Sequence, residues 1–196
     1  MKESPLTFSG LLRAMFLSYI RSNTLFGLSH GFGPLYAIFI LLYSLSITTT
    51  YFNAAENELY WQKVYYSSLT FEQIQQKVKE ADIFDTMSIN DNKITGDLKL
   101  LDFDCKVIGY NRTPLYMKVY KNTGFVMINS QKGKYTVTCS KMILVNKDKN
   151  IFANFDEHIN LEKYALEKGT NHIRKSFEET SGKVLNYTFT NMFSFH

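Results

Sequence analysis

The chain has 196 residues, enough for one domain and an appended segment, and an apolar fraction of 45% with 20% charged residues excludes an intrinsically disordered protein. The net charge of +4 comes from lysines that alternate with acidic residues, so we expect no nucleic-acid partner. The two cysteines form no C-x-x-C pair and no cluster with histidine, so we expect no zinc site and no other cofactor.

Residues 1–31 are predicted to form an amphipathic segment on the matrix or cytoplasmic side of a membrane. Arg13 and Arg21 lie off an apolar stripe that has helical spacing. Two interpretations stay open: a helix held on the membrane surface or by a partner, and a mitochondrial targeting sequence. The stripe consists of Phe8, Leu11, Leu12, Met15, Phe16, Tyr19 and Ile20.

Residues 32–55 are predicted to form one transmembrane helix. No Asp, Glu, Lys or Arg occurs from Ser22 to Ala55. About 20 apolar residues are needed to cross the hydrocarbon layer, and the segment meets that length. More basic residues precede this segment than follow it, which predicts that the N-terminus lies in the matrix and the larger part of the chain in the intermembrane space.

Residues 56–145 are predicted to form an extramembrane α+β domain. A helix is expected over residues 56–66, and a second one over residues 69–84, where Thr70 and Gln73 have the spacing of a capping box. The polar stretch "DTMSINDNK" is expected to be a turn. Strands are then expected in "KITGDLKLL", "FDCKVIGY", "PLYMKVYK", "FVMINS" and "KYTVTCSKMILV".

The last three predicted strands alternate between apolar and polar residues, and Gly124 and Gly133 stand at turn positions between them. Such a pattern is typical of an antiparallel meander with one buried face. The preceding helix is expected to cover that face. The fold class expected is therefore α+β: an amphipathic helix, one transmembrane helix, a helix packed on a small antiparallel sheet, and a C-terminal helix with an extended tail.

Residues 146–196 are predicted to form a helical and extended C-terminal arm. Apolar residues from Ile159 to Phe177 have helical spacing, with Gly169 as an interruption. The final stretch "VLNYTFTNMFSFH" is too apolar to remain in water. It is expected to lie either on another subunit or on the sheet of its own chain, and both alternatives stay open.

Few residues suggest chemistry. Cys105 and Cys139 lie on separate predicted strands, where a disulfide is one alternative and two buried free thiols are the favoured one. Asp102 and Asp104 are too few for a calcium site. No serine has the setting of a nucleophile, so we expect no enzyme. The remaining candidates are His30, His158, His172, His196 and the glycosylation sequons at Asn111 and Asn186.

Taken in order, a single span, the helix in "YYSSLTFEQIQQKVKEADIF" and the strands up to Val145 resemble the mitochondrial inner-membrane family that contains the cytochrome oxidase assembly factor and the intermembrane-space subunit of the presequence translocase. The similarity covers residues 65–145 and includes a final strand of the form G-x-Tyr-x-Val, from Gly133 to Val137. The usual Leu-Gly pair is missing at residues 85–89. The resemblance implies a small α+β domain without catalytic residues.

The sequence thus favours a non-catalytic, single-span accessory subunit of a respiratory-chain complex in the mitochondrial inner membrane. Its expected partners are the lipid bilayer and other membrane subunits. A bacterial envelope protein, whose α+β domain binds a peptide or belongs to a secretion machine, is the alternative hypothesis.

Overall fold

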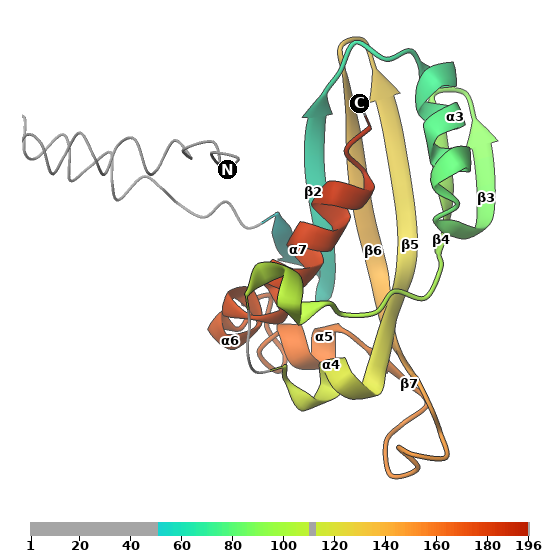
Figure 1. The fold of residues 1–196 in the computed structure, drawn as a ribbon. Helices are drawn as coiled ribbons and strands as arrows, with labels where there is room; N and C mark the ends of the chain where they lie inside the picture. Colours follow the sequence, from blue (N-terminus) through green and yellow to red (C-terminus); the bar gives the residue numbers. More distant parts are fainter. Residues whose placement is uncertain (1–50, 110–112, 196) are drawn as a thin grey trace, which may run out of the picture. The chain divides into compact units, whose positions relative to one another are not determined.

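The computed structural model describes residues 51–109 and 113–195, and their main feature is a seven-stranded sheet (Figure 1). The strand order is β1-β2-β6-β5-β4-β3, and every neighbouring pair is antiparallel. The short β7 pairs with β6 beyond the end of β2. The strands are β1 Phe52–Ala55, β2 Glu58–Tyr66, β3 Phe84–Asn90, β4 Lys93–Leu98, β5 Tyr120–Gln131, β6 Lys134–Asn146 and β7 His158–Asn160.

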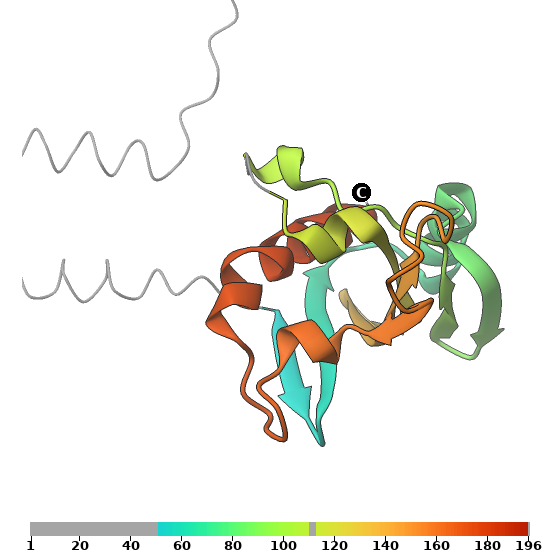
Figure 2. The same ribbon diagram turned by 90° about the horizontal axis from the view of Figure 1, so that it is seen from below.

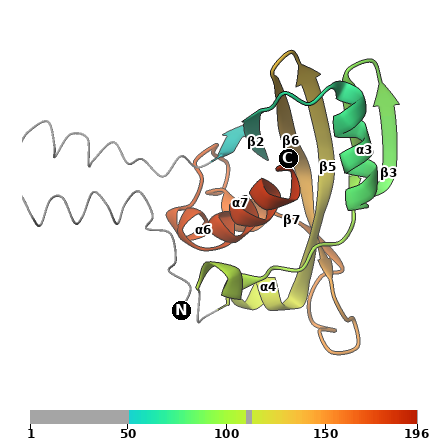
Figure 3. The ribbon, with the colours of Figure 1, turned by 45° about the horizontal axis from the view of Figure 1, so that its top comes forward.

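The helices are short and gather on one side of this sheet (Figure 2). In Figure 3, α7 lies across β2 and β6, and in Figure 1, α3 lies beside β4 and β3. No helix of the described residues covers the opposite face of the central strands. The helices are α3 Phe71–Ala81, α4 Leu115–Val119, α5 Glu162–Ala165, α6 Lys175–Glu179 and α7 Ser181–Met192, with a 3-10 helix, η1, at Cys105–Ile108.

Alternation along β6 decides which face of the sheet is covered. Tyr135 and Val137 are buried beneath the helices, whereas Thr136 and Thr138 are only half-buried on the other face. The same period continues across the sheet, because Val137 pairs with the buried Ile128 of β5. Side chains of a strand point alternately to its two faces, so one apolar face on each strand is enough to build this core.

The C-terminal segment completes the core of its own chain. In α7, the ring of Phe189 packs edge-on against Trp61 of β2, with 5.4 Å between ring centroids. Beyond α7, the Tyr135 hydroxyl donates to the carbonyl of Phe193 at 2.8 Å and accepts from the amide of Phe195 at 3.0 Å. The predicted extended tail is therefore a helix, and of the two alternatives for its location, packing on its own sheet is confirmed.

The capping box predicted at the start of the second helix is confirmed. The amide of Gln73 donates to the Thr70 hydroxyl at 3.3 Å, and the Gln73 side chain accepts from the Thr70 amide at 2.8 Å. The helix ends at Asp82, whose backbone is left-handed with φ 48°. Ile74 and Val78 are the buried residues of α3.

Several predicted elements are wrong. The stretch expected as a helix over residues 56–66 is strand β2, joined to β1 by the two-residue turn Glu56–Asn57. Both turn residues have positive φ, 54° and 62°, as a tight hairpin turn with the twist of the strands requires. Two predicted strands are helical: "FDCKVIGY" contains η1, and "PLYMKVYK" contains α4 before β5 begins. The expected turn "DTMSINDNK" is mostly strand β3.

The predicted fold class is also wrong. The described part of the chain is mostly antiparallel sheet with short helices, and no helix within residues 51–109 and 113–195 is long and apolar enough to cross a membrane. The predicted amphipathic segment, residues 1–31, and most of the predicted span, residues 32–50, lie outside the described residues. At the far end of that span, Phe52–Ala55 forms β1 instead of a helix, because its backbone pairs with β2.

Candidate functional site

Strand β3 is the free edge of the sheet. It is last in the strand order, and Figure 1 shows no element of the described chain beyond it. All of its residues except Phe84 are exposed, including the apolar side chains of Met87 (38%) and Ile89 (36%). An edge strand has a row of unpaired N–H and C=O groups, which makes it a template for a further strand.

The ladder between β3 and β4 determines which backbone groups are free. Asn90 and Lys93 are the last pair before the two-residue turn Asp91–Asn92, so they form the hydrogen-bonded pair that closes the hairpin. Since hydrogen-bonded and non-bonded pairs alternate along an antiparallel ladder, Met87 and Ile89 direct their N–H and C=O groups away from β4.

The start of β3 is fixed in place by a close approach to β4. The ring of Phe84 packs over Gly96, where an added Cβ would lie 2.2 Å from the carbonyl oxygen of Thr86. A register shift between Phe84 and Thr86 marks a bulge at Asp85. Beside it, the Thr86 hydroxyl donates to Asp97 at 2.8 Å. The edge from Thr86 to Asn90 is therefore held in register by its pairing with β4.

The other edge of the sheet is less accessible for strand addition. β1 has four residues, and the amide of Asn57, in the turn that follows it, donates to the side chain of Asn171 at 2.8 Å. β3 has seven residues, six of them exposed, so it is the longer template.

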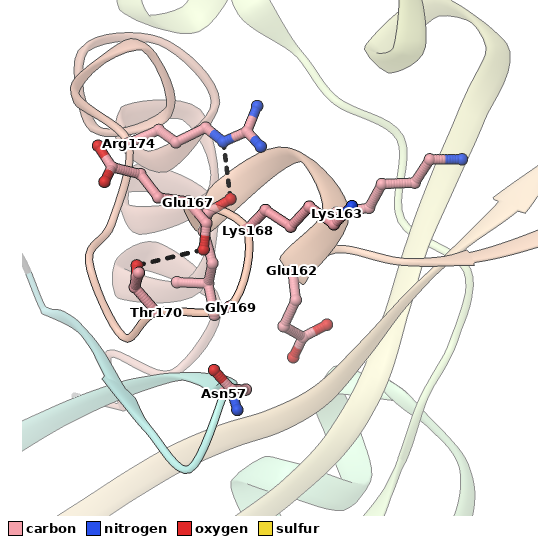
Figure 4. Close-up of a pocket in the computed structure, with 9 residues that line it drawn as sticks. Asn57, Glu162, Lys163, Glu167, Lys168, Gly169, Thr170 and Arg174 are labelled. Atoms are coloured by element: carbon pink, nitrogen blue, oxygen red, sulfur yellow. Dashed lines mark hydrogen bonds between the residues drawn. The ribbon is translucent and has the colours of Figure 1, made fainter.

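A second feature is a pocket of about 400 Å³ between the β1–β2 turn and the chain from α5 to α6 (Figure 4). Its polar groups are largely engaged in fastening this loop. Glu162 accepts from the amide of Leu59 at 3.1 Å, and Arg174 donates through Nε to the carbonyl of Leu166 at 2.7 Å. Thr170 donates to the carbonyl of Glu167 at 3.2 Å. These hydrogen bonds hold the loop in place, so the polar lining of the pocket has a structural role.

The two cysteines are buried free thiols in separate elements, which is the favoured of the two sequence alternatives. Cys105 begins η1, with its Sγ 3.9 Å from the Sδ of Met117. Cys139 is in the middle of β6, opposite Trp61. Burial raises the pKa of the Cys139 thiol far above its ordinary value. A thiol kept protonated in this way is a poor nucleophile and metal ligand.

Asp102 and Asp104 each have a structural role. Asp102 contacts Lys147 at 2.8 Å and Lys121 at 3.3 Å, and the hydrogen bond from Lys147 holds its pKa below the ordinary range. Asp104 accepts from the amide of Lys106 and so caps η1. No cluster of three metal-ligating side chains occurs among the residues that the structure describes.

The structure describes two of the four histidines and one of the two sequon residues. His158 in β7 and His172 near α6 are both exposed, and His30 and His196 lie outside the described residues, as does the sequon residue Asn111. The side chain of Asn186, the other sequon residue, accepts from the Trp61 indole at 2.8 Å. That hydrogen bond gives the half-buried Asn186 a structural role, because it ties α7 to β2.

The β3 edge is the feature that sequence reasoning missed. Its signal was present, because "SIN" and "KIT" flank the two polar residues Asp91 and Asn92, which is the pattern of a two-residue hairpin. The many polar residues of "DTMSINDNK" concealed it. Only two apolar residues, Met87 and Ile89, alternate with polar ones in this stretch, which is a weak signal for a strand.

No family model and no curated protein matches the chain. Among solved structures, the chain is similar to a DUF4468 family protein from Bacteroides ovatus, with 13% identity over 76% of this chain and 93% of that one and a TM-score of 0.45. It is also similar to a TBP-like protein from Parabacteroides distasonis, with 10% identity over 71% of this chain and 92% of that one and a TM-score of 0.42. Both likenesses are too distant to transfer a function.

The predicted mitochondrial inner-membrane topology is corrected by these findings. The described part contains no helix able to span a membrane, and β1 occupies the end of the predicted span. The interpretation as a single-span respiratory-chain subunit is therefore not retained.

Proposed function

We propose that this chain is a non-enzymatic peptide-binding protein that takes up an extended segment of a partner as an additional strand beside β3. This keeps the peptide-binding part of the second sequence hypothesis, the bacterial envelope protein. The observation that carries the proposal is the free edge from Thr86 to Asn90, with its outward backbone groups at Met87 and Ile89.

The backbone of β3 supplies the affinity of such a complex. Main-chain hydrogen bonds hold a strand that is added to a sheet edge, while alternate side chains give specificity. The side chains of Met87 and Ile89 lie on the same face of the sheet as the buried Ile94 of β4, because Ile89 pairs with Ile94. Their exposed apolar surface would be covered by apolar side chains of an added strand.

The edge also lacks the usual protection against pairing. Native edge strands are commonly protected by lysine, proline or an inward-pointing charge. Between Thr86 and Asn90 the chain has none of these residues, and the bulge lies before this segment, at Asp85. A long edge without protection is typical of a strand that pairs with a partner.

A catalytic role has less support. The buried Cys139 is kept protonated, and in the pocket beside α5 the side chains of Glu162 and Arg174 are bonded to the backbone of Leu59 and Leu166. The hydroxyl of Tyr116 is paired with Ser181, and burial raises the pKa of Tyr116 to about 12, so neither is available as a general base.

The proposal is tested with the 196-residue chain and a fluorescein-labelled heptapeptide of alternating threonine and valine. Fluorescence anisotropy should show saturable binding, with a Kd on the order of micromolar to sub-millimolar. In NMR spectra, changes in amide chemical shift should be concentrated at Met87, Ile89 and their neighbours. Absence of binding at millimolar peptide, or shift changes centred away from β3, would overturn it.

Substitution of the edge separates backbone pairing from apolar contact. Met87→Pro removes one outward N–H and leaves the bonds to β4 intact, so the fold is expected to remain and binding to be lost. Met87→Leu keeps the N–H and is the matched control. Ile89→Pro is the second variant if Met87→Pro does not fold, and unchanged binding by a folded proline variant contradicts the proposal.

A further inference from the structure

The hairpin that forms the edge is acidic within a basic chain. Residues 84–98 contain three carboxylates, Asp85, Asp91 and Asp97, against one ammonium, Lys93, which gives a net charge of −2. The whole chain has a net charge of +4. The local charge at the proposed docking edge therefore has the opposite sign to the charge of the molecule.

Two of these carboxylates frame the edge. Asp85 lies in the bulge before the free segment and Asp91 in the turn after it, so along a strand they are separated by roughly 20 Å. Within the part of the chain that the structure describes, no ion pair involves either residue. The nearby Asp82, by contrast, is paired with Lys99 at 2.5 Å.

We infer that the segment bound beside β3 is basic at both ends and apolar at alternate positions between them. This inference rests on the proposed strand addition and specifies its ligand class. Lysine or arginine side chains near the ends of the added strand would meet Asp85 and Asp91, and the intervening apolar residues would meet Met87 and Ile89. Opposite charges at the rim of an interface raise the association rate and select the partner.

The same charges disfavour a second copy of the chain as the occupant. Antiparallel pairing of β3 with β3 of another copy would bring two hairpins, each with a charge of −2, side by side. A basic peptide instead neutralises part of this negative charge. Sedimentation of the free protein is expected to give a monomer, and a dimer that Met87→Pro abolishes would overturn the inference.

The test compares three peptides with the same threonine–valine centre, flanked by lysine, by glutamine or by glutamate. At an ionic strength of about 0.02 M we expect the lysine peptide to bind about tenfold more tightly than the glutamate peptide. Salt screens exposed charges, so at about 0.5 M this ratio should fall to about twofold or less.

The double variant Asp85→Asn/Asp91→Asn should remove the preference for the lysine peptide and leave the glutamine peptide unaffected. Glu56→Gln, in the turn beside the opposite edge strand β1, is the matched control and should preserve the preference. Equal affinity of the three peptides, or an unchanged preference in the double variant, overturns the charge inference alone. If none of the peptides binds, the strand-addition proposal is wrong and the inference with it.

Discussion

The indole N–H of Trp61 donates to the side-chain oxygen of Asn186 at 2.8 Å, which ties the centre of β2 to α7. Trp61 is fully buried, and the two residues are separated by 125 positions in the chain. A buried indole without an acceptor would carry the full cost of its desolvation. This bond therefore fixes the orientation of the C-terminal helix on the sheet.

Asn186→Leu is expected to lower the free energy of unfolding by about 1–3 kcal/mol, because the Trp61 N–H would be buried without a partner. Urea denaturation followed by tryptophan fluorescence measures this change directly, since Trp61 is the single tryptophan. The control is Asn191→Leu, at an exposed position of the same helix, which should change stability by less than about 0.5 kcal/mol. Equal effects of the two substitutions would show that the bond contributes nothing.

Gly96→Ala is expected to detach β3 from β4, since the new Cβ would lie 2.2 Å from the Thr86 carbonyl oxygen and 2.8 Å from the Phe84 ring. Overpacking of this kind costs about 1–3 kcal/mol. Amide hydrogen exchange should show loss of protection in β3 and β4, with β6 unchanged, and peptide binding should disappear. Thr95→Ala, on the uncovered face, is the control, and wild-type exchange in Gly96→Ala would contradict the packing argument.

Asn122 is fully buried, and its side-chain amide makes no hydrogen bond within the described residues. Asn122→Leu is therefore expected to leave the free energy of unfolding unchanged or to raise it by about 1 kcal/mol. Asn146→Leu is the matched comparison, because its amide donates to the Phe152 carbonyl at 3.1 Å and its oxygen accepts from the Asp148 amide at 3.1 Å. That substitution should cost about 1–3 kcal/mol. A comparable loss in Asn122→Leu would refute the expectation.

Asp102 makes folding depend on pH. The hydrogen bond from Lys147, with a smaller effect of Lys121, lowers its pKa in the folded state. A lowered folded-state pKa adds stability above the unfolded value of about 4, and this stability is lost as the pH falls through the folded value. Because the Asp102 side chain is 59% exposed, Asp102→Asn should cost at most about 1 kcal/mol at pH 7 and nothing near pH 2. Denaturation at both pH values measures it, and a difference that persists at pH 2 would contradict the linkage.

Thiol titration tests the state of the two cysteines. Both are buried and free, and burial raises the pKa of Cys139, so neither should react with an aromatic disulfide reagent in the native protein at pH 8. In urea without reductant, two thiols per chain should react. If no thiol reacts in urea, Cys105 and Cys139 are joined by a disulfide, contrary to the structure.

Local signals were sufficient where the information is contained in a short stretch. The capping box of Thr70 and Gln73 starts α3 by satisfying backbone N–H groups within one turn, so sequence alone predicts it. The alternation of Tyr135, Val137 and Cys139 likewise predicts a half-buried strand, because period two is the geometry of a strand.

Where a stretch of sequence suits either a helix or a strand, pairing with other strands decided its structure. "ELYWQKVYY" has residues that suit a membrane-proximal helix, and it is β2 because β1 and β6 bond to both of its edges. Contacts far along the chain, such as Trp61 with Phe189 and Asn186, determine that the C-terminal stretch is a helix on its own sheet. The free edge of β3 follows from the strand order, which is a property of the whole sheet. The sequence by itself determined the periodicities and caps, whose energies are local, whereas only the tertiary structure decided strand order and helix placement, because those depend on burial between distant residues.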